Sequence, residues 1–380
     1  TGQAYETLAY FTDTYGPRMA GTKSYKNAAE YVIHELQSID RFDNVHTHPA
    51  RVPLWSRGEE WAQMIAPRVA NIGILGLGGS VGTVNNETLE ADCIVARSFA
   101  ELDRIGKSGN VSNKILVFNQ PYISYSHSST YRRLAASRAA SYGAKAALVR
   151  SAVPRSLYSL ATGQMNYDRS FPRIPTAAIT AEDAEMMWRM QQRGQHVRMK
   201  LKITSTRLGW TIDDNIIAEI TGSQYPNEVV LLSGHFDSWD VGTGAMDDGG
   251  GVVIAWQTLR TLKALGLTPK RTVRIAFWAA EEQGMYGSRA YYQSSKTSND
   301  RYIFVAESDE GAFAPSGLQF SGYKNLNQRA IMQSILNLAQ SINATQLCPL
   351  GDGEDVQPWI NEGIPGVWLQ NPNKTDYYFE

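Results

Sequence analysis

The sequence has 380 residues, of which 43% are hydrophobic and 19% are charged, so it can bury a large core and is not a disordered chain. Lys and Arg together number 36 against 37 Asp and Glu, and this net charge of −1 argues against binding to a nucleic-acid backbone. Cys93 and Cys348 are too few for a disulfide framework or a Cys-type zinc site, and no apolar run approaches the roughly 20 residues of a membrane-spanning helix.

The N-terminal segment is predicted to form two helices. Residues 6–15 precede a Gly-Pro break, and Thr22 is placed to cap a second helix over 24–39. Apolar side chains recur at helical spacing in the second run. They are Ala28, Tyr31, Val32 and Leu36.

Residues 66–207 have a different residue pattern from the N-terminal segment. Short strand-like pieces alternate with Gly, Ser and Pro turns, and they lie at 71–75, 92–95, 114–118 and 146–149. The glycine-rich stretch 76–79 has no P-loop lysine after it and is interpreted as a turn. The block offers few candidate catalytic residues, so we expect an inserted β-rich domain here.

From residue 215 the pattern is α/β. Strands are predicted at 215–220, 228–232, 272–278, 301–305 and 366–369, and helices at 249–265 and 328–342. Apolar runs between Pro and Gly are typical of parallel strands that are buried on both faces. The fold class is therefore predicted to be α/β, with a mostly parallel sheet covered by helices on both faces.

Histidine and acidic residues follow the predicted strands of this C-terminal part. The carboxyl ends of parallel strands gather at one edge of an open sheet, so these side chains are expected to converge although they lie far apart in sequence. They are His235, Asp237, Asp247, Glu281, Glu282 and Asp309.

Imidazole with carboxylates and no thiolate suits Zn, Mn or Co better than Ca or Mg. Several carboxylates, one of them able to bridge, suggest two metals. In the pair Glu281-Glu282, one carboxylate can bind metal while the other takes a proton. Asp237 could accept the second ring N–H of His235. Each of these motifs alone also has a structural interpretation: the His as a packed residue, the Glu pair as solvated surface and the Asp pair as a helix cap. Their occurrence together at strand ends favours the metal site.

These motifs resemble the M28 family of zinc peptidases, and the resemblance covers nearly the whole chain. The motifs are His235-Phe-Asp-Ser-Trp-Asp240, Gly244-Ala-Met-Asp-Asp-Gly-Gly-Gly251, Trp278-Ala-Ala-Glu-Glu-Gln-Gly284 and Glu307-Ser-Asp309, with further similarity at 16–21, 57–60, 73–78, 119–122 and 181–187. The resemblance implies a hydrolase with two zinc ions. His235 and Asp309 would bind one zinc, Glu282 the other, and Asp247 would bridge both.

The same resemblance implies roles for two further acids and a domain plan. Glu281 would be the general base and then the acid, and Asp237 would support His235. The peptide bond between residues 247 and 248 would be cis. Residues 1–65 would form the N-terminal part of the catalytic domain, 66–207 a protease-associated insertion, and 208–380 the main part of the catalytic domain.

The resemblance has one departure, at the C-terminus. The family takes its last zinc ligand from a histidine that follows a sequence like Asp376-Tyr-Tyr-Phe379, but this sequence ends at Glu380. The remaining histidines have no matching context; they are His34, His46, His48, His127 and His196. The catalytic domain is therefore expected to be truncated, and the second zinc, held by Glu282 and Asp247 alone, to be weakly bound.

The expected activity is exopeptidase hydrolysis of short peptides, above all dipeptides with free termini. The resemblance also suggests a secreted or lysosomal glycoprotein and a homodimer, with N-x-[ST] sequons at Asn86, Asn110, Asn343 and Asn373. Three alternatives stay open: a metal-poor interaction protein on the same fold, an aminopeptidase that acts on longer chains, and a single-zinc glutaminyl cyclase.

Overall fold

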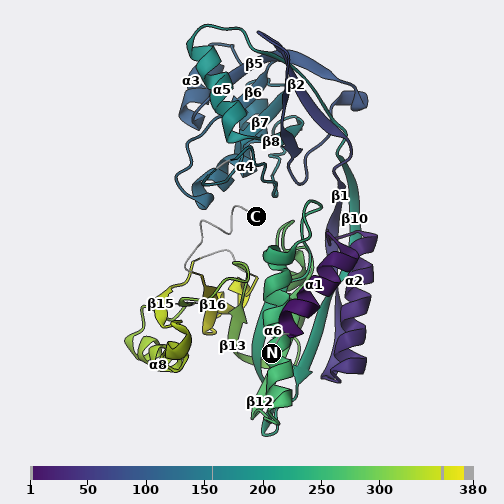
Figure 1. The fold of residues 1–380 in the computed structure, drawn as a ribbon, viewed down its shortest axis with the longest axis vertical. Coiled ribbons are helices and arrows are strands. Elements are labelled where there is room, and N and C mark those ends of the chain that lie inside the picture. The colour runs from purple at the N-terminus through teal and green to yellow at the C-terminus, as the bar shows by residue number, and fades with distance from the viewer. Residues whose placement is uncertain (1–2, 156, 352–354, 372–380) are drawn as a thin grey trace. The chain divides into compact units, whose positions relative to one another are not determined.

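The computed structural model describes residues 3–155, 157–351 and 355–371. The chain divides into two compact units, shown in Figure 1. The first unit comprises the residues up to Pro53 and those from Trp210 onward, and the second comprises Leu54–Gly209. The long strands β1 (Asp43–Ser56) and β10 (Thr206–Ile220) run across the two boundaries.

The first sheet has eight strands in the order β1-β10-β12-β11-β13-β16-β14-β15. Strand β11 is central and runs parallel to both β12 and β13, and β13 runs parallel to β16. Only β10–β12 and β14–β16 are antiparallel among the described pairings. This confirms the mostly parallel sheet. The strands are β11 (Tyr225–His235), β12 (Arg271–Trp278), β13 (Arg301–Glu307), β14 (Gly317–Phe320), β15 (Gln346–Pro349) and β16 (Gly366–Gln370).

The helices predicted for this unit are confirmed, although their ends shift by a few residues. Thr22 caps the second helix, and its Oγ1 accepts a hydrogen bond from Tyr25 N at 3.2 Å. The helices are α1 (Gln3–Tyr15), α2 (Lys23–His34) with a π-helical end (Glu35–Ile39), α6 (Gly250–Ala264), α7 (Tyr286–Ser295), α8 (Leu326–Leu336) with a 3₁₀ end (Asn337–Ile342) and α9 (Gln357–Asn361). The sequence patterns did not predict α7 or α9.

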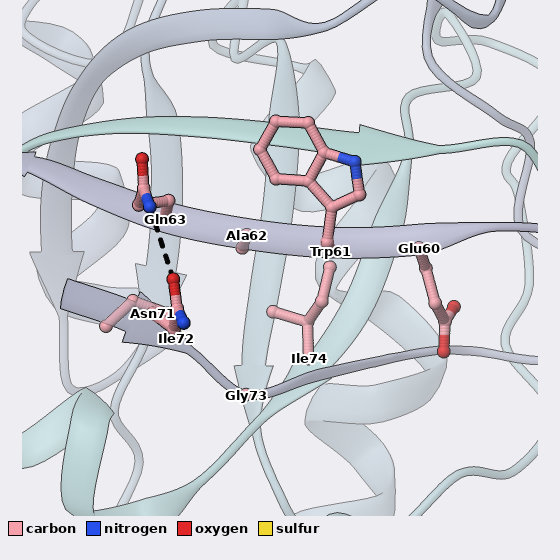
Figure 2. Close-up of a pocket in the computed structure, with 8 residues that line it drawn as sticks. All are labelled: Glu60, Trp61, Ala62, Gln63, Asn71, Ile72, Gly73 and Ile74. Carbon is pink, nitrogen blue, oxygen red and sulfur yellow. Dashed lines mark hydrogen bonds between the residues drawn. The ribbon is translucent and has the colours of Figure 1, made fainter.

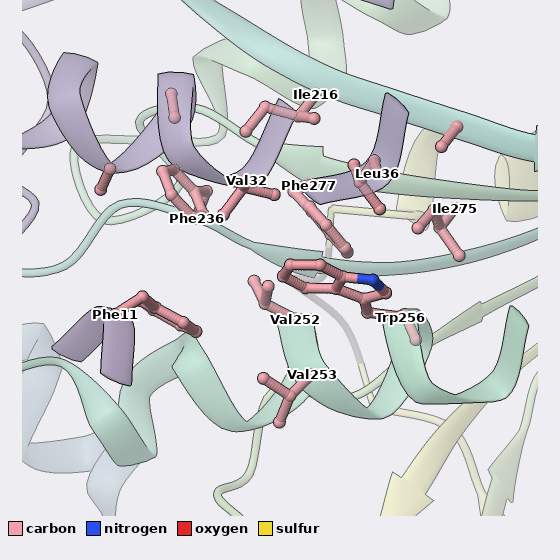
Figure 3. Close-up of a cluster of buried hydrophobic side chains, with 14 of the residues drawn as sticks. Phe11, Val32, Leu36, Ile216, Phe236, Val252, Val253, Trp256, Ile275 and Phe277 are labelled. Carbon is pink, nitrogen blue, oxygen red and sulfur yellow. The ribbon is translucent and has the colours of Figure 1, made fainter. Parts of the chain in front are cut away.

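Alternate residues of the central strands enter two different cores, as expected for a sheet that is covered on both faces. On one face, Phe277 of β12 packs with Phe11, Val32 and Trp256 from α1, α2 and α6 (Figure 3). On the other face, Trp278 packs with side chains of α7 and α9. The two cores fix the strand register, and the register determines which residues emerge at the strand ends.

The second unit has its own eight-stranded sheet, in the order β3-β2-β9-β5-β6-β7-β8-β4. Strands β5 to β8 run parallel to one another. The strands are β2 (Glu60–Ala66), β3 (Ala70–Ile72), β4 (Ile74–Gly76), β5 (Leu89–Ala96), β6 (Ile115–Phe118), β7 (Ala146–Arg150), β8 (Thr176–Ile179) and β9 (Arg198–Ile203), with a 3₁₀ turn at Val84–Asn86. The turn expected at 76–79 lies one residue later, since Gly76 ends β4 and Ser80 N donates to Leu77 O.

Three helices in this unit were not predicted: α3 (Phe99–Lys107), α4 (Tyr125–Ala140) and α5 (Ala181–Gln192). The unit is therefore less purely β-rich than the sequence indicated. Its identification as a protease-associated domain stays a prediction. Both cysteines are free thiols. Within the described residues, no helix has the length and apolar character needed to cross a bilayer.

Candidate metal centre

Three predicted ligands from separate segments meet at the carboxyl edge of the first sheet. His235 is the last residue of β11 and is fully buried, Asp247 lies in the turn before α6, and Asp309 follows β13 by two residues. His235 Nε2 lies 2.9 Å from Asp247 Oδ1 and 3.3 Å from Asp309 Oδ1. One donor atom from each of the three lies within 4.8 Å of the others. The predicted convergence of these side chains is therefore observed.

Glu281 and Glu282 lie in the turn between β12 and α7. Glu281 Oε2 is 3.9 Å from His235 Nε2. The backbone carbonyl of Glu281 accepts hydrogen bonds from Gly284 N and Met285 N, which closes the turn. Glu282 is oriented by its backbone, because its N–H donates to Asp237 Oδ2 at 3.3 Å. The turn thus brings the Glu281 carboxylate to the edge where the three ligands meet, and the charges of Asp247 and His235 act on Glu282.

Asp237 supports the site differently from the sequence expectation. Its carboxylate accepts the backbone N–H groups of Glu281 and Glu282, at 2.9 and 3.3 Å. His235 Nδ1 lies 2.9 Å from the backbone carbonyl of Asp237 and 3.7 Å from its carboxylate. A ring N–H that donates to this carbonyl leaves Nε2 free to bind a metal. One residue therefore orients both the imidazole and the two glutamates.

Asp248 is a structural neighbour of the site that the sequence did not assign. The peptide bond between Asp247 and Asp248 is cis, as the resemblance predicted. The buried Asp248 carboxylate accepts His235 N at 3.0 Å and Gly251 N at 2.8 Å. It therefore ties the end of β11 to the start of α6, while its neighbour Asp247 faces the imidazole.

The close approach of these segments requires glycine at position 251. A Cβ on Gly251 would lie 1.9 Å from Ser308 O and 2.4 Å from Asp248 Oδ2, well inside van der Waals contact. Because Ser308 O belongs to the backbone, the segment that carries Asp309 would have to move. Gly251 thus sets the spacing between α6 and the end of β13.

Replacement of Gly251 by Ala is expected to lower the free energy of unfolding by about 3 kcal/mol, the upper range for overpacking. Gly351→Ala is the matched control, because the nearest atom to an added Cβ there is 4.0 Å away, and it is expected to change stability by less than about 0.5 kcal/mol. Urea unfolding monitored by tryptophan fluorescence measures both. Equal midpoints for Gly251→Ala and the unmodified chain would contradict the tight packing.

Arg18 is a second residue that the motifs did not mark as part of the site. It is fully buried, and its guanidinium donates to the carbonyls of Phe236, Thr243 and Gly244 at 2.8–2.9 Å. Burial lowers the pKa of Arg18 to about 10, and the carboxylates of Asp237 and Asp248 oppose that shift. Arg18 therefore holds the loop between β11 and Asp247. The sequence around Arg18, a Gly-Pro-Arg stretch after α1, did not indicate this role.

The electrostatics of the cluster fit a divalent cation. Burial, opposed by His235 and reinforced by Asp247, raises the pKa of Asp309 to about 6. Burial also raises the pKa of Glu281 and of Glu282 well above the usual range. Burial alone would lower the pKa of His235, but the facing carboxylates outweigh it and raise that pKa. A cation would favour the deprotonated form of every one of these groups, and an imidazole with carboxylates is a donor set that zinc accepts.

Asp355 is a third residue near the site that the sequence did not identify. It is buried just before α9, and burial raises its pKa to about 7. The charges of Asp237 and Asp309 contribute to this shift, which places Asp355 within electrostatic reach of the cluster. It lies in the run Gly351-Asp-Gly-Glu-Asp355, which is typical of a solvated loop. The stretch from Asp376 to Phe379, which the family's last histidine ligand would follow, lies outside the described residues.

A separate cavity of about 580 Å³ lies in the second unit, along β2, β3 and β4 (Figure 2). Its polar side chains are paired with their own neighbours: Gln63 donates to Asn71 Oδ1 at 3.2 Å, and Glu60 accepts Gly76 N at 2.8 Å. None of the predicted site residues lines it. The chemistry suggested by the sequence therefore belongs to the sheet edge of the first unit.

Known proteins resemble the chain over its whole length. Residues 215–379 match peptidase family M28. Carboxypeptidase Q from Homo sapiens is 47% identical over 377 residues, which cover 99% of this chain and 79% of that protein. Carboxypeptidase Q from Bos taurus is 48% identical over 367 residues, covering 97% of this chain and 76% of that protein.

Solved structures show the same fold. The crystal structure of a peptidase M28 precursor from Shewanella amazonensis SB2B superposes with a TM-score of 0.93 at 29% identity, covering 100% of this chain and 86% of that chain. A zinc aminopeptidase from Bacillus subtilis superposes with a TM-score of 0.70 at 20% identity, covering 97% and 85% of the two chains. With the identity to carboxypeptidase Q, these findings establish that the chain belongs to peptidase family M28 and is a zinc metallopeptidase.

Proposed function

We propose that the protein is a dinuclear zinc exopeptidase that hydrolyses short peptides, chiefly dipeptides with free termini, and that its second zinc binds more weakly than its first. The observation that carries the proposal is the convergence of His235, Asp247 and Asp309, with Glu281 3.9 Å from the imidazole. His235 and Asp309 would hold one zinc, Glu282 the other, and Asp247 both. Relatives named carboxypeptidase Q support exopeptidase action.

The residues divide the chemistry between them. Zinc, when bound, supplies Lewis-acid polarisation of the scissile carbonyl and lowers the pKa of the attacking water. Glu281 takes the proton of that water and later gives it to the leaving amine. Burial raises the pKa of Glu281, which favours the protonated form that donates to the leaving amine. Asp237 keeps this carboxylate in place through the backbone N–H of Glu281.

Product analysis tests the proposed substrate class. Zinc-loaded protein is incubated with dipeptides, the same dipeptides blocked at either end, longer peptides and peptides with N-terminal Gln, and the products are identified by mass spectrometry. Hydrolysis of free dipeptides alone supports the proposal. Stepwise release of N-terminal residues from longer peptides would favour an aminopeptidase. Cyclisation of the N-terminal Gln would favour a glutaminyl cyclase. A protein that neither binds zinc nor cleaves any of them would be the metal-poor interaction protein.

We also propose that the chain is a secreted or lysosomal glycoprotein that forms a homodimer. The sequons at Asn86, Asn110 and Asn343 are exposed, so each is accessible to glycan transfer, while Asn373 lies outside the described residues. A glycosidase-dependent mass shift of protein secreted from cultured cells tests whether the chain is a secreted glycoprotein. Light scattering tests whether it forms a homodimer.

Zinc affinity is expected to rise with pH across the neutral range. The metal binds the deprotonated forms of Asp309, whose pKa is raised to about 6, and of His235, whose pKa is raised well above its usual value. Below about pH 6 both groups hold protons that zinc must displace, so the apparent affinity falls roughly tenfold per pH unit for each proton released. Calorimetric zinc titrations in buffers of different ionisation enthalpy count these protons. An affinity that does not change with pH would contradict the prediction.

A further inference from the structure

Asp355 is a buried carboxylate that the proposed chemistry does not use. Its side chain is 1% exposed, and its Oδ1 accepts a hydrogen bond from the hydroxyl of Ser288, which is itself fully buried. Its Oδ2 accepts no hydrogen bond from any residue in the described part of the chain. An incompletely bonded buried carboxylate destabilises a fold, so the contacts of Asp355 call for a physical explanation.

Ser288 connects Asp355 to the turn that carries the proposed general base. It lies in the first turn of α7, directly after the turn with Glu281 and Glu282. Its hydroxyl oxygen lies 3.4 Å from Met285 O, and Met285 N donates to Glu281 O at 2.9 Å. The Asp355–Ser288 hydrogen bond therefore anchors the same short segment whose other end Asp237 holds.

The residues next to Asp355 bind both strand ends of the site. Val356 N donates to Glu307 Oε2 at 3.3 Å, and Glu307 is the last residue of β13. Trp359 of α9 stacks on Trp278, the last residue of β12, with ring centroids 5.9 Å apart and an interplanar angle of 26°. The segment with Asp355 is thus fixed against the two strands that deliver Glu281 and Asp309.

We infer that Asp355 is a positioning residue for Glu281. Through Ser288 it holds the first turn of α7, and with it the preceding turn, so that the Glu281 carboxylate keeps one orientation at the sheet edge. Asp355 acts through another residue and does not itself react. The inference rests on the proposed role of Glu281. A displacement of a reacting group by about 1 Å costs on the order of 100-fold in rate, so a small shift of this turn has a measurable effect.

Three variants test the inference. Ser288→Ala and Asp355→Ala each remove the hydrogen bond, and kcat for a dipeptide is expected to fall about 10- to 100-fold, with KM within about twofold and zinc content unchanged. Asp355→Asn keeps a side-chain oxygen that accepts the Ser288 hydroxyl, so its kcat is expected to stay within about threefold of the unmodified enzyme. Ser294→Ala, an exposed position on the same helix, is the matched control and is expected to have no effect.

Hydrogen exchange of residues 279–287, followed by mass spectrometry, provides a second readout that needs no catalysis. In Ser288→Ala these amides are expected to exchange at least about tenfold faster than in the unmodified chain, while β11 stays protected. Unchanged exchange with kcat within twofold in Ser288→Ala, or an Asp355→Asn variant as impaired as Asp355→Ala, would overturn the inference. If Asp355→Ala does not fold, the other two variants decide. If the unmodified protein cleaves no peptide, the proposed function fails while the exchange comparison still tests the positioning.

Discussion

Replacement of Glu281 by Gln is expected to lower kcat by about 10²- to 10⁴-fold and to leave zinc binding intact. Glutamine keeps the shape of the side chain but cannot accept the proton of the attacking water. The backbone N–H of residue 281 would still donate to Asp237 Oδ1, so the turn should keep its conformation. Because Glu281 is not assigned as a zinc ligand, metal content should stay equal to that of the unmodified enzyme. Stopped-flow or continuous dipeptide assays measure the rate, and elemental analysis measures the metal.

Glu30→Gln is a suitable control for this variant. Glu30 is exposed on α2, and its replacement makes the same chemical change away from the sheet edge, so kcat should match that of the unmodified enzyme. A Glu281→Gln enzyme that retains more than about a tenth of the original kcat would remove Glu281 from the role of general base. Loss of zinc in that variant would instead show that Glu281 is a ligand.

The fold of the first unit was predictable because its central strands are buried toward their carboxyl ends. Buried parallel strands need continuous apolar runs, and the runs at 228–232 and 272–278 end where β11 and β12 end, within a few residues. Such runs also locate the polar residues that follow them, which is why the sequence alone places His235 and Asp309 at one sheet edge.

Helix α4 of the second unit was missed because its buried face consists mainly of small residues. Helix α4 buries Ala and Ser residues, among them Ala135, Ala139 and Ser128, so it has no stripe of large apolar side chains. Its N-cap was visible, since Ser124 accepts a hydrogen bond from His127 N. The same holds for Ser98 and Thr180, which cap α3 and α5. Capping residues alone predict where a helix starts but not that it forms.

The finer parts of the site depended on contacts that sequence spacing does not encode. Asp247 and Asp248 are adjacent and chemically identical, yet one faces the imidazole and the other binds backbone N–H groups. Arg18 reaches carbonyls more than 200 positions away. Asp237 does support the site, but its carboxylate was expected on the ring of His235 rather than on the glutamate turn.

Replacement of Asp247 by Asn is expected to abolish activity in a different way, through loss of metal. Asp247 Oδ1 lies 2.9 Å from His235 Nε2, and the residue is assigned to both zinc ions. Asparagine keeps one oxygen but loses the negative charge that offsets the two cations. Loss of a residue that only hydrogen-bonds to a metal ligand already lowers metal affinity about 10- to 100-fold. Loss of the ligand Asp247 itself should therefore lower zinc affinity at least about 100-fold.

Calorimetric zinc titration of Asp247→Asn, beside the exposed Asp13→Asn as control, measures that change. Comparison with Glu281→Gln separates the two roles, because one variant should be inactive without zinc and the other inactive with zinc. In the double variant, kcat should fall no further than in Asp247→Asn, since a base has nothing to act on when the metal is gone. If Asp247→Asn binds two zinc ions with unchanged affinity, the bridging assignment is wrong, and His235 with Asp309 and Glu282 must hold the metals without it.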